Sequence, residues 1–255
     1  MSAEVRLPAL FGDHMVLQRD MPLPVWGWAS PGESVKVTLG DASATATTSD
    51  DGAWRVTLPA RSAARGLELI VSANQTLTFS DVAIGEVWVC SGQSNMQWNV
   101  GATWNGDLEI VAADQPDIRL ISVHNPGSQS PVEDFPGAWE CCTPEAARQF
   151  SAVGYYFGKR LQETLGVPVG LIDNAWGGSA CGAWTPREAM AADAVFKPTM
   201  DWWASQEKDF DEAADLAAFQ KRLDGWERAV DRAKASGARA PERPNPRRLS
   251  LANRR

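Results

Sequence analysis

A serine is the strongest candidate for chemistry in this chain. Ser94 lies in the run Gly-Gln-Ser-Asn-Met at residues 92–96, four residues after Cys90 closes an apolar segment. Ligand sites of open α/β sheets gather at the carboxyl ends of the strands, so a serine in this position would face the cleft. Gly92 permits a tight turn, and backbone N–H groups of such a turn can face a developing oxyanion. By spacing alone, however, an ordinary turn with a helix cap is the simpler explanation.

A second loop with paired glycines follows another apolar segment. Residues 173–179 read Asp-Asn-Ala-Trp-Gly-Gly-Ser and come directly after the apolar residues 167–172. Glycines let backbone N–H donors approach a ligand closely. Two such loops after two parallel strands would lie at the same edge of the sheet. Because the first of them carries Ser94, the pair favours acyl transfer.

Apolar runs predict the strands that would position these loops, at residues 82–90, 118–123 and 167–172. Continuous apolar runs are typical of strands buried on both faces of a parallel sheet. Between the last two runs, residues 152–165 predict a crossover helix, with Ser151 as its N-cap and Gly166 as its C-terminal stop. From residue 81 onward, the alternation of strand and helix predicts an α/β domain with a parallel sheet.

The first eighty residues follow a different pattern. Short, partly alternating apolar runs recur between turn signals at residues 12–13, 30–32, 50–52 and 66, with no helical period between them. This regular spacing predicts a small β-sandwich over residues 1–80. We expect it to be an accessory domain.

Beyond residue 186 the chain becomes helical and acidic up to about residue 235. Five apolar residues fall at steps of three and four on one helix face: Leu216, Phe219, Leu223, Trp226 and Val230. A helix packed on the α/β body explains this stripe better than a partner-binding helix. Residues 236–255, with six arginines and one glutamate, are interpreted as an exposed basic linker.

Composition narrows the classes of partner and ligand that this chain could bind. The 255 residues are 44% hydrophobic and 22% charged, which is typical of a globular protein. A net charge of −8 argues against nucleic acid or an anionic membrane, and no apolar run approaches the roughly eighteen residues of a membrane helix. Four cysteines and two histidines show no zinc-ligand spacing, so neither metal nor cofactor is expected. No signal peptide is visible, which predicts a cytoplasmic protein, or an exported one whose leader is missing.

Residues 85–98, Gly-Glu-Val-Trp-Val-Cys-Ser-Gly-Gln-Ser-Asn-Met-Gln-Trp, closely resemble the nucleophile block of the sialate O-acetylesterase family, a branch of the SGNH-type hydrolases. Residues 170–186 resemble the second block of that family, and residues 10–19 and 25–28 resemble its leading β-module. The resemblance runs from about residue 7 to residue 224. It implies a small β-sandwich followed by an SGNH-hydrolase-like α/β domain over residues 81–255.

The resemblance also implies roles for individual residues. Ser94 would attack an acetyl carbonyl and form an acetyl-enzyme, which water then hydrolyses. Gly178 and Gln93, together with the backbone at Ser94, would form the oxyanion hole. The remaining members would shape the substrate pocket: Asn95, Gln97, Trp98, Trp176 and Gly177.

The catalytic base of that family has no counterpart in this sequence. The base belongs to an Asp-x-x-His motif, which follows a further oxyanion block of the Gln-Gly-Glu-Ser-Asn type, and neither motif occurs here. The two histidines are His14, in the β-module, and His124, a minor candidate that follows a predicted strand. Because a serine needs a base near neutral pH, we expect the α/β domain to be incomplete at its C-terminus.

Three functions stay open. The first is a serine hydrolase that removes O-acetyl groups from sialic acid or related sugars through acetyl-Ser94. The second keeps the fold but acts on acetylated xylan or pectin. The third is an inactive, truncated protein that binds carbohydrate or another partner, which the missing Asp-x-x-His motif supports. An O-acetylated sugar is the expected ligand, and the sequence leaves the oligomeric state undetermined.

Overall fold

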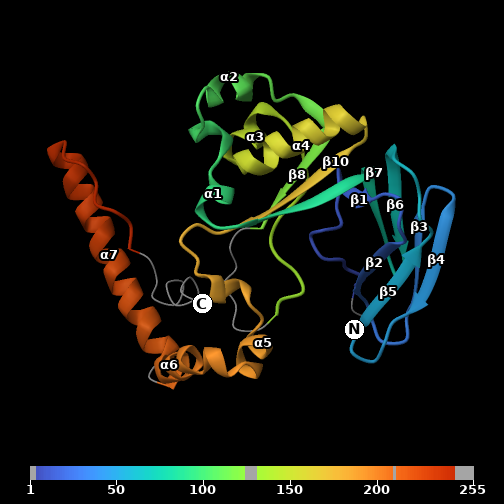
Figure 1. The fold of residues 1–255 in the computed structure, drawn as a ribbon. Helices are drawn as coiled ribbons and strands as arrows, with labels where there is room; N and C mark the ends of the chain where they lie inside the picture. Colours follow the sequence, from blue (N-terminus) through green and yellow to red (C-terminus); the bar gives the residue numbers. More distant parts are fainter. Residues whose placement is uncertain (1–3, 124–130, 209–210, 245–255) are drawn as a thin grey trace. The chain divides into compact units, whose positions relative to one another are not determined.

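The computed structural model describes residues 4–123, 131–208 and 211–244 (Figure 1). The chain divides into two units, of which the first ends at Gly177 and the second begins at Gly178. In the first unit the main sheet has the strand order β4-β3-β6-β7-β10-β8-β9, with β1 paired to β7. Strands β2 and β5 form a separate two-stranded sheet. The chain is therefore a mixed α/β protein, as its alternating segments predict.

Strands dominate the first eighty residues. They are β1 (Val16–Gln18), β2 (Leu23–Trp28), β3 (Ser34–Leu39), β4 (Ala42–Thr47), β5 (Ala53–Leu58) and β6 (Ala64–Ser72). Along β3, the buried Val35, Val37 and Leu39 alternate with more exposed residues, because successive side chains point to opposite faces of a sheet. They pack in one buried cluster with Val56 of β5 and Leu69 of β6. The alternation in the sequence thus marks the core face.

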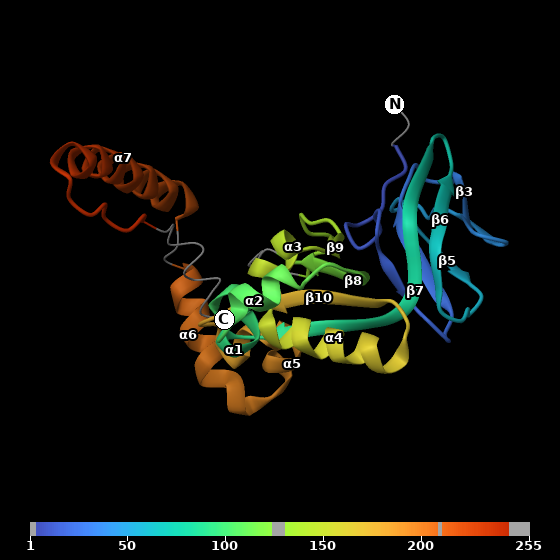
Figure 2. The same cartoon turned by 90° about the horizontal axis from the view of Figure 1, so that it is seen from above.

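Strand β7 (Thr76–Gly92) is 17 residues long and leads from the β-module into the α/β part (Figure 2). Its first part pairs antiparallel with β6, whereas residues 86–92 pair in parallel with β10 (Val169–Ala175). Within the part that pairs with β6, Asp81 has a φ of 52°, which interrupts regular extended backbone where the pairing register shifts between Phe79 and Val82. The change of pattern predicted at residue 81 therefore falls inside one continuous strand.

Strand β10 lies between β7 and β8 (Gln115–Ser122) and runs parallel to both, while β9 (Glu140–Cys142) pairs antiparallel with β8. Shorter helical segments connect these strands: α1 (Ser94–Gln97), a 3₁₀ turn (Val100–Ala102), α2 (Gly106–Val111) and α3 (Pro144–Gln149). The predicted crossover helix is α4 (Ala152–Leu165). The Gly154 N–H donates to Ser151 Oγ at 3.0 Å, and Gly166 ends the helix with a φ of 67°. The helix and both of its end signals are thus confirmed.

Helix α4 packs closely on the sheet because two of its residues are glycines. A Cβ at Gly154 would lie 2.7 Å from Cys90 Sγ, and one at Gly158 would lie 2.6 Å from Leu171 Cδ1. These partners belong to β7 and β10, the strands that lead to the two candidate loops. Because these two glycines have no side chain, the helix can lie close to the strands that lead to the candidate site (Figure 2).

Four side chains, named here the junction cluster, meet where β7 bends: His14, Asp81, Arg119 and Cys141. The Arg119 side chain is 9% exposed, and it donates to Asp81 Oδ2 at 2.5 Å. His14 Nδ1 lies 2.8 Å from the same oxygen. Hydrogen bonding from the Arg119 guanidinium lowers the pKa of Asp81 below its ordinary value, although burial acts in the opposite direction. Because Arg119 lies on β8, the ion pair fastens the bend of β7 to the α/β sheet.

The second unit is helical. It contains α5 (Arg187–Ala192), α6 (Lys197–Lys208) and α7 (Glu212–Ser236), with 3₁₀ turns at Cys181–Trp184 and Ala194–Phe196. Helix α7 is the helix that the apolar stripe predicts, and the stripe runs from an exposed Leu216 to half-buried residues. The Trp226 indole donates to Pro241 O at 2.9 Å, so residues after α7 fold back on it. Packing of α7 on the α/β body stays a prediction.

Two further predictions concern the basic linker and membrane-spanning helices. Within the predicted linker, residues 238–244 have no helix or strand, and residues 245–255 lie outside the described residues. Among the described helices, none combines the length and apolarity needed to cross a bilayer.

The junction cluster generates a stability prediction. Asp81→Asn leaves the buried Arg119 guanidinium without its counter-charge, and we expect the free energy of unfolding to fall by about 1–2 kcal/mol near neutral pH, less than for a fully buried pair because Asp81 is partly exposed. Asp201→Asn, which breaks the exposed pair with Lys197, is the matched control and should change stability by less than about 0.5 kcal/mol.

Acid should abolish the difference between wild type and Asp81→Asn. The pKa of Asp81 is lowered in the folded state, so its contribution is present above the unfolded value of about 4 and is lost as the pH falls through the folded pKa. Urea unfolding at several pH values measures this. A difference that stays constant down to about pH 2 would contradict the assignment.

Candidate active site

The two candidate loops leave the sheet side by side. Parallel pairing of β7 with β10 sets Gly92 opposite Ala175, so both strands end at the same edge. The Trp176 N–H donates to Gly92 O at 2.8 Å, which ties the start of the second loop to the end of β7. Gly92 has a φ of 142°, a value that favours glycine, and the chain turns there toward α1. The loops are therefore neighbours, as the sequence predicts.

Ser94 is the first residue of α1, and its side chain is exposed. Its hydroxyl donates to Gln93 Oε1 at 3.3 Å. A Cβ built on Gly177 would lie 3.6 Å from Ser94 Oγ, so the backbone of the second loop passes beside this hydroxyl. A group bound at Ser94 Oγ would therefore also face the backbone at Gly177.

Gln97 fixes the second loop against α1. Its Oε1 accepts a hydrogen bond from the Gly177 N–H at 2.6 Å, and a Cβ at position 177 would lie 2.5 Å from that oxygen. A side chain at position 177 would therefore require the end of the Gln97 side chain to shift. The sequence assigns both residues to the substrate pocket, and the structure joins them to each other. Since this bond uses the Gly177 N–H, an oxyanion would need other backbone donors.

The other predicted site residues are Asn95, Trp98, Trp176 and Gly178. Asn95 is exposed on α1. Trp98, the residue directly after α1, is 57% exposed, and its indole N–H donates to Ala102 O at 3.1 Å. Trp176 is half-buried. Gly178 is exposed, has a φ of 79° and is the first residue of the second unit. The roles of these residues toward a ligand stay predictions.

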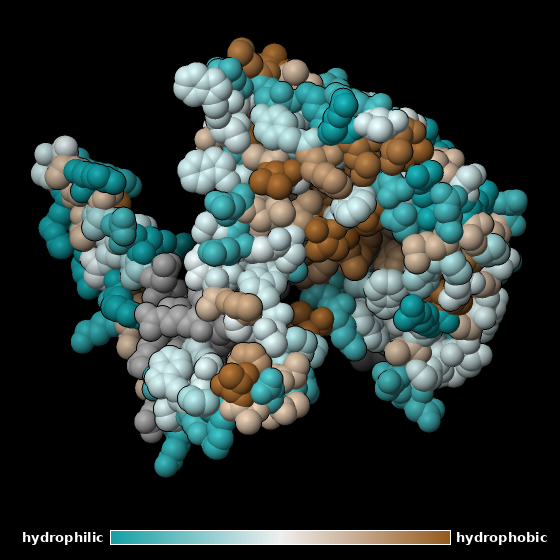
Figure 3. All heavy atoms as spheres, in the orientation of Figure 1, coloured by the Kyte–Doolittle hydropathy of each residue, from teal (hydrophilic) through white to brown (hydrophobic). Residues whose placement is uncertain are grey.

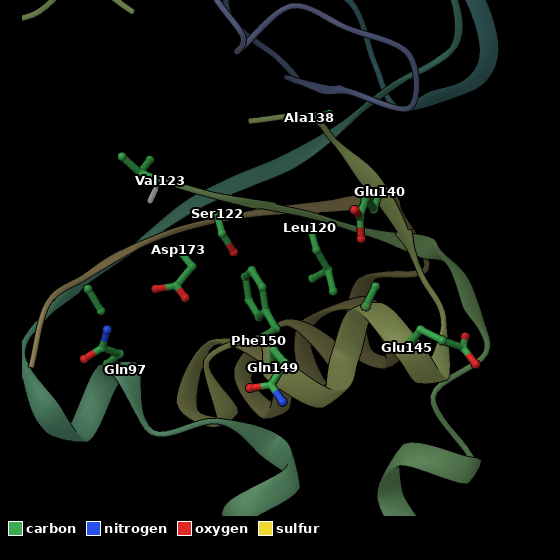
Figure 4. Close-up of a pocket in the computed structure, with 12 residues that line it drawn as sticks. Gln97, Leu120, Ser122, Val123, Ala138, Glu140, Glu145, Gln149, Phe150 and Asp173 are labelled. Atoms are coloured by element: carbon green, nitrogen blue, oxygen red, sulfur yellow. The ribbon is translucent and has the colours of Figure 1, made fainter. Parts of the chain in front are cut away.

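A hollow of about 410 Å³, named here the acidic hollow, opens beside α1 (Figure 4). Its polar side chains come from five elements and are Gln97, Ser122, Glu140, Glu145, Gln149 and Asp173. Its lining contains three carboxyl groups and no lysine, arginine or histidine among the described residues. The sequence does not predict this hollow, because most of its members lie outside any motif. Of its polar side chains, only those of Gln97 and Asp173 belong to the motifs at residues 85–98 and 170–186.

Asp173 also affects the neighbouring cysteine. On β10 it lies opposite Ser122 of β8 and Cys90 of β7. Burial, together with the charge of Asp173, raises the pKa of the Cys90 thiol to about 11. A thiol so rarely ionised near neutral pH is a poor nucleophile. Cys90 is also buried, whereas Ser94 is exposed, so Ser94 is the better candidate nucleophile of the two.

The structure does not bring His14 to Ser94. His14 belongs to the junction cluster, and strand β1 beside it pairs Val16 with Ala83, whereas Ser94 follows the far end of β7. The strand between these levels is about 30 Å long, at roughly 3.3 Å per residue. His124 lies outside the described residues. Among the described residues, Ser94 thus has no histidine within reach.

The junction cluster is the one grouping of described residues whose side chains could ligate a metal. The ligand atoms of His14, Asp81 and Cys141 lie within 4.8 Å of one another. However, the Arg119 guanidinium already contacts Asp81 and lies 3.2 Å from His14 Nδ1. A metal cation would be repelled by this nearly buried positive charge. We interpret the cluster as structural, and the sequence analysis missed it because its members are far apart in the chain.

Comparisons with known proteins identify a family and several relatives. Residues 84–235 match the family described as carbohydrate esterase, sialic acid-specific acetylesterase. Human sialate O-acetylesterase is 31% identical over 213 residues, which cover 75% of this chain and 41% of the relative. The mouse protein of the same name is 30% identical and is covered over 39% of its length. The chain thus spans about two fifths of the curated relatives that it matches.

A solved structure is similar as well. A carbohydrate acetylesterase from Xanthomonas citri superposes with a TM-score of 0.72 at 38% sequence identity, over 75% of this chain and 44% of that one. The family match includes Ser94, Gly177 and Gly178, the residues of the two neighbouring loops. The chain belongs to the sialic acid-specific acetylesterase family of carbohydrate esterases.

Proposed function

We propose that this protein hydrolyses O-acetyl esters of sugars, with Ser94 as the nucleophile. One observation carries the proposal: the exposed Ser94 hydroxyl lies at the carboxyl edge of a parallel sheet, directly beside the glycine backbone of a second loop. Membership of a carbohydrate esterase family supports the reaction class. The combination is suited to acyl transfer, because it pairs a nucleophile with backbone donors at a strand end.

In this proposal Ser94 Oγ attacks the acetyl carbonyl and loses its proton to a base. The carbonyl oxygen becomes an oxyanion, which hydrogen bonds from the Gly178 backbone and from Gln93 stabilise. Collapse of the tetrahedral intermediate breaks the ester bond, and the sugar oxygen takes the proton as it leaves. Water then attacks acetyl-Ser94, releases acetate and restores the hydroxyl. Gln97 acts as a positioning residue, because it holds the second loop through Gly177.

We propose further that the base comes from a segment outside these 255 residues. The SGNH-like domain at residues 81–255 would then be partial, preceded by a β-sandwich at residues 1–80. Support comes from β7, since residues 86–92 pair with β10 and with no other described strand. Trp88 (44% exposed) and Val89 (61%) lie there, with the Phe157 ring centred 5.0 Å from that of Trp88. Figure 3 shows hydrophobic residues exposed over this part of the first unit.

A second candidate substrate has its own support. The relatives are named for sialate, and a sialic acid carries a carboxylate. The acidic hollow beside α1 contains Glu140, Glu145 and Asp173 without a described cation in its lining, so it would repel that carboxylate. Acetylated neutral sugars, such as those of xylan, meet no such repulsion. The hollow therefore favours a neutral acetylated glycan within the same chemistry.

The non-catalytic alternative has one supporting observation. Among the described residues no histidine approaches Ser94, so these residues supply no histidine base. The experiments below separate this alternative from the esterase.

The nucleophile is tested with 4-nitrophenyl acetate, an activated ester, and with imidazole supplied as an external base. We expect wild type to exceed Ser94→Ala by about tenfold when imidazole is present, because general-base assistance at a serine is worth at least that much. Ser205→Ala, an exposed serine of α6, is the control and should match wild type. Equal rates for wild type and Ser94→Ala would favour the binding-only alternative.

The positioning role of Gln97 is tested with Gln97→Ala. Loss of its bond should speed amide hydrogen exchange at Gly177 and lower kcat on 4-nitrophenyl acetate about three- to tenfold, since one hydrogen bond contributes about 0.5–1.5 kcal/mol. Gln149→Ala removes a side chain from the same hollow without touching Gly177 and serves as the control. Unchanged exchange at Gly177 in Gln97→Ala would refute the role.

The substrate class is tested by comparing acetylated xylotetraose with 9-O-acetyl-N-acetylneuraminic acid, again with imidazole supplied as the external base. We expect the neutral substrate to give the higher kcat/KM. Glu140→Gln combined with Glu145→Gln should bring the kcat/KM values of the two substrates closer together, because it weakens the repulsion of the sialic acid carboxylate. A preference for the sialic acid in wild type would instead support the substrate named for the relatives.

A further inference from the structure

A second hollow lies in the β-module, far along the chain from Ser94. It measures about 660 Å³ and opens among β2, β4 and β5, which lie together in Figure 1. Its lining shares no residue with the acidic hollow. Three of its residues are tryptophans: Trp26, Trp28 and Trp54. A volume in this range accommodates a small ligand such as one or two sugar rings.

Two of these tryptophans stand on one face of β2. Trp26 and Trp28 are two residues apart, so their side chains project to the same side, opposite Arg55 and Ala53 of β5. Both are half-buried. The Arg6 guanidinium lies 3.9 Å from the centre of the Trp28 ring, which restrains that ring in place. Preset indole surfaces of this kind suit the flat apolar face of a pyranose.

Trp54 also lines the hollow, but it lies opposite Gly27 and so points to the other face of the ladder, where it packs in the core. It is 3% exposed, and its indole N–H has no hydrogen-bond acceptor among the described residues. Gly27 makes room for it, because a Cβ there would lie 2.9 Å from Trp54 Cζ2. Trp54 is therefore a core residue, and Trp26 and Trp28 offer the aromatic surface of the hollow.

The rim of the hollow is polar and balanced in charge. Thr47, Arg55 and Glu133 are exposed and line it. A hydroxyl, a guanidinium and a carboxylate together can donate to and accept from sugar hydroxyls. One positive and one negative group give no net attraction for an anion. The rim therefore fits a neutral ligand rich in hydroxyl groups.

We infer that this tryptophan hollow binds a neutral pyranose unit of a glycan, at a site separate from Ser94. Trp26 and Trp28 contact the ring face, and the polar rim binds the hydroxyls. Binding here requires no ester and no catalytic base, so the inference stands independently of the proposed hydrolysis. It gives the β-module a function of its own in holding a glycan chain.

The test is titration of the whole chain with xylotetraose, followed by tryptophan fluorescence and calorimetry. We expect saturable binding that weakens about tenfold in Trp28→Ala and about threefold in Arg55→Ala. Trp104→Ala removes a tryptophan that is 92% exposed and outside the hollow, and Ser94→Ala alters the other site; both should bind like wild type. Hydrolysis of 4-nitrophenyl acetate should be unchanged in Trp28→Ala, so that failure of this inference and failure of the esterase proposal are distinguishable.

Several outcomes would overturn the inference. They are no saturable binding of xylotetraose, equal affinity in Arg55→Ala and wild type, or tighter binding of the anionic sialyllactose than of xylotetraose. If circular dichroism shows that Trp28→Ala is unfolded, Thr47→Val decides together with Arg55→Ala. Thr47→Val keeps the shape of this exposed rim residue and removes its hydroxyl, and it should weaken binding about threefold. Unchanged affinity in both variants would refute the site.

Discussion

The parallel pairing of β7 with β10 is the constraint on which the candidate site depends. It sets Gly92 level with Ala175, so that two loops distant in the chain begin side by side. The Ser94 hydroxyl then lies beside Gly177, and Gln97 can reach the Gly177 N–H. A shift of register by one residue would turn every side chain of the strand to the other face and separate these contacts. Helix α4 supports the pairing from one face through its glycines, and the junction cluster fastens the bend of β7.

Much of this architecture could be predicted from the sequence. The apolar runs mark β7, β8 and β10, because strands buried on both faces exclude polar side chains. Ser151 and Gly166 mark the two ends of α4, because each satisfies a specific need of a helix terminus. From parallel strands alone it follows that the loops share an edge. Strand order does not follow, and the position of β10 between β7 and β8 required the structure.

Contacts between distant residues explain what the sequence could not predict. The sequence does not indicate the junction cluster, because no two of its residues, at positions 14, 81, 119 and 141, belong to the same motif. The acidic hollow likewise draws its carboxyl groups from β9, α3 and β10. For Gln97, the motif indicates a place near Ser94 but not which of its atoms is used. The oxygen of Gln97 binds the protein backbone, which makes this side chain a support for the loop.

Covalent chemistry at Ser94 is the central claim, and mass spectrometry tests it most directly. The whole chain is incubated with 4-nitrophenyl acetate and imidazole, quenched in acid and digested. The account predicts one acetyl group on the peptide that contains Ser94, absent from the Ser94→Ala protein. Acetylation confined to other residues, or none on that peptide at any time of quenching, would contradict it.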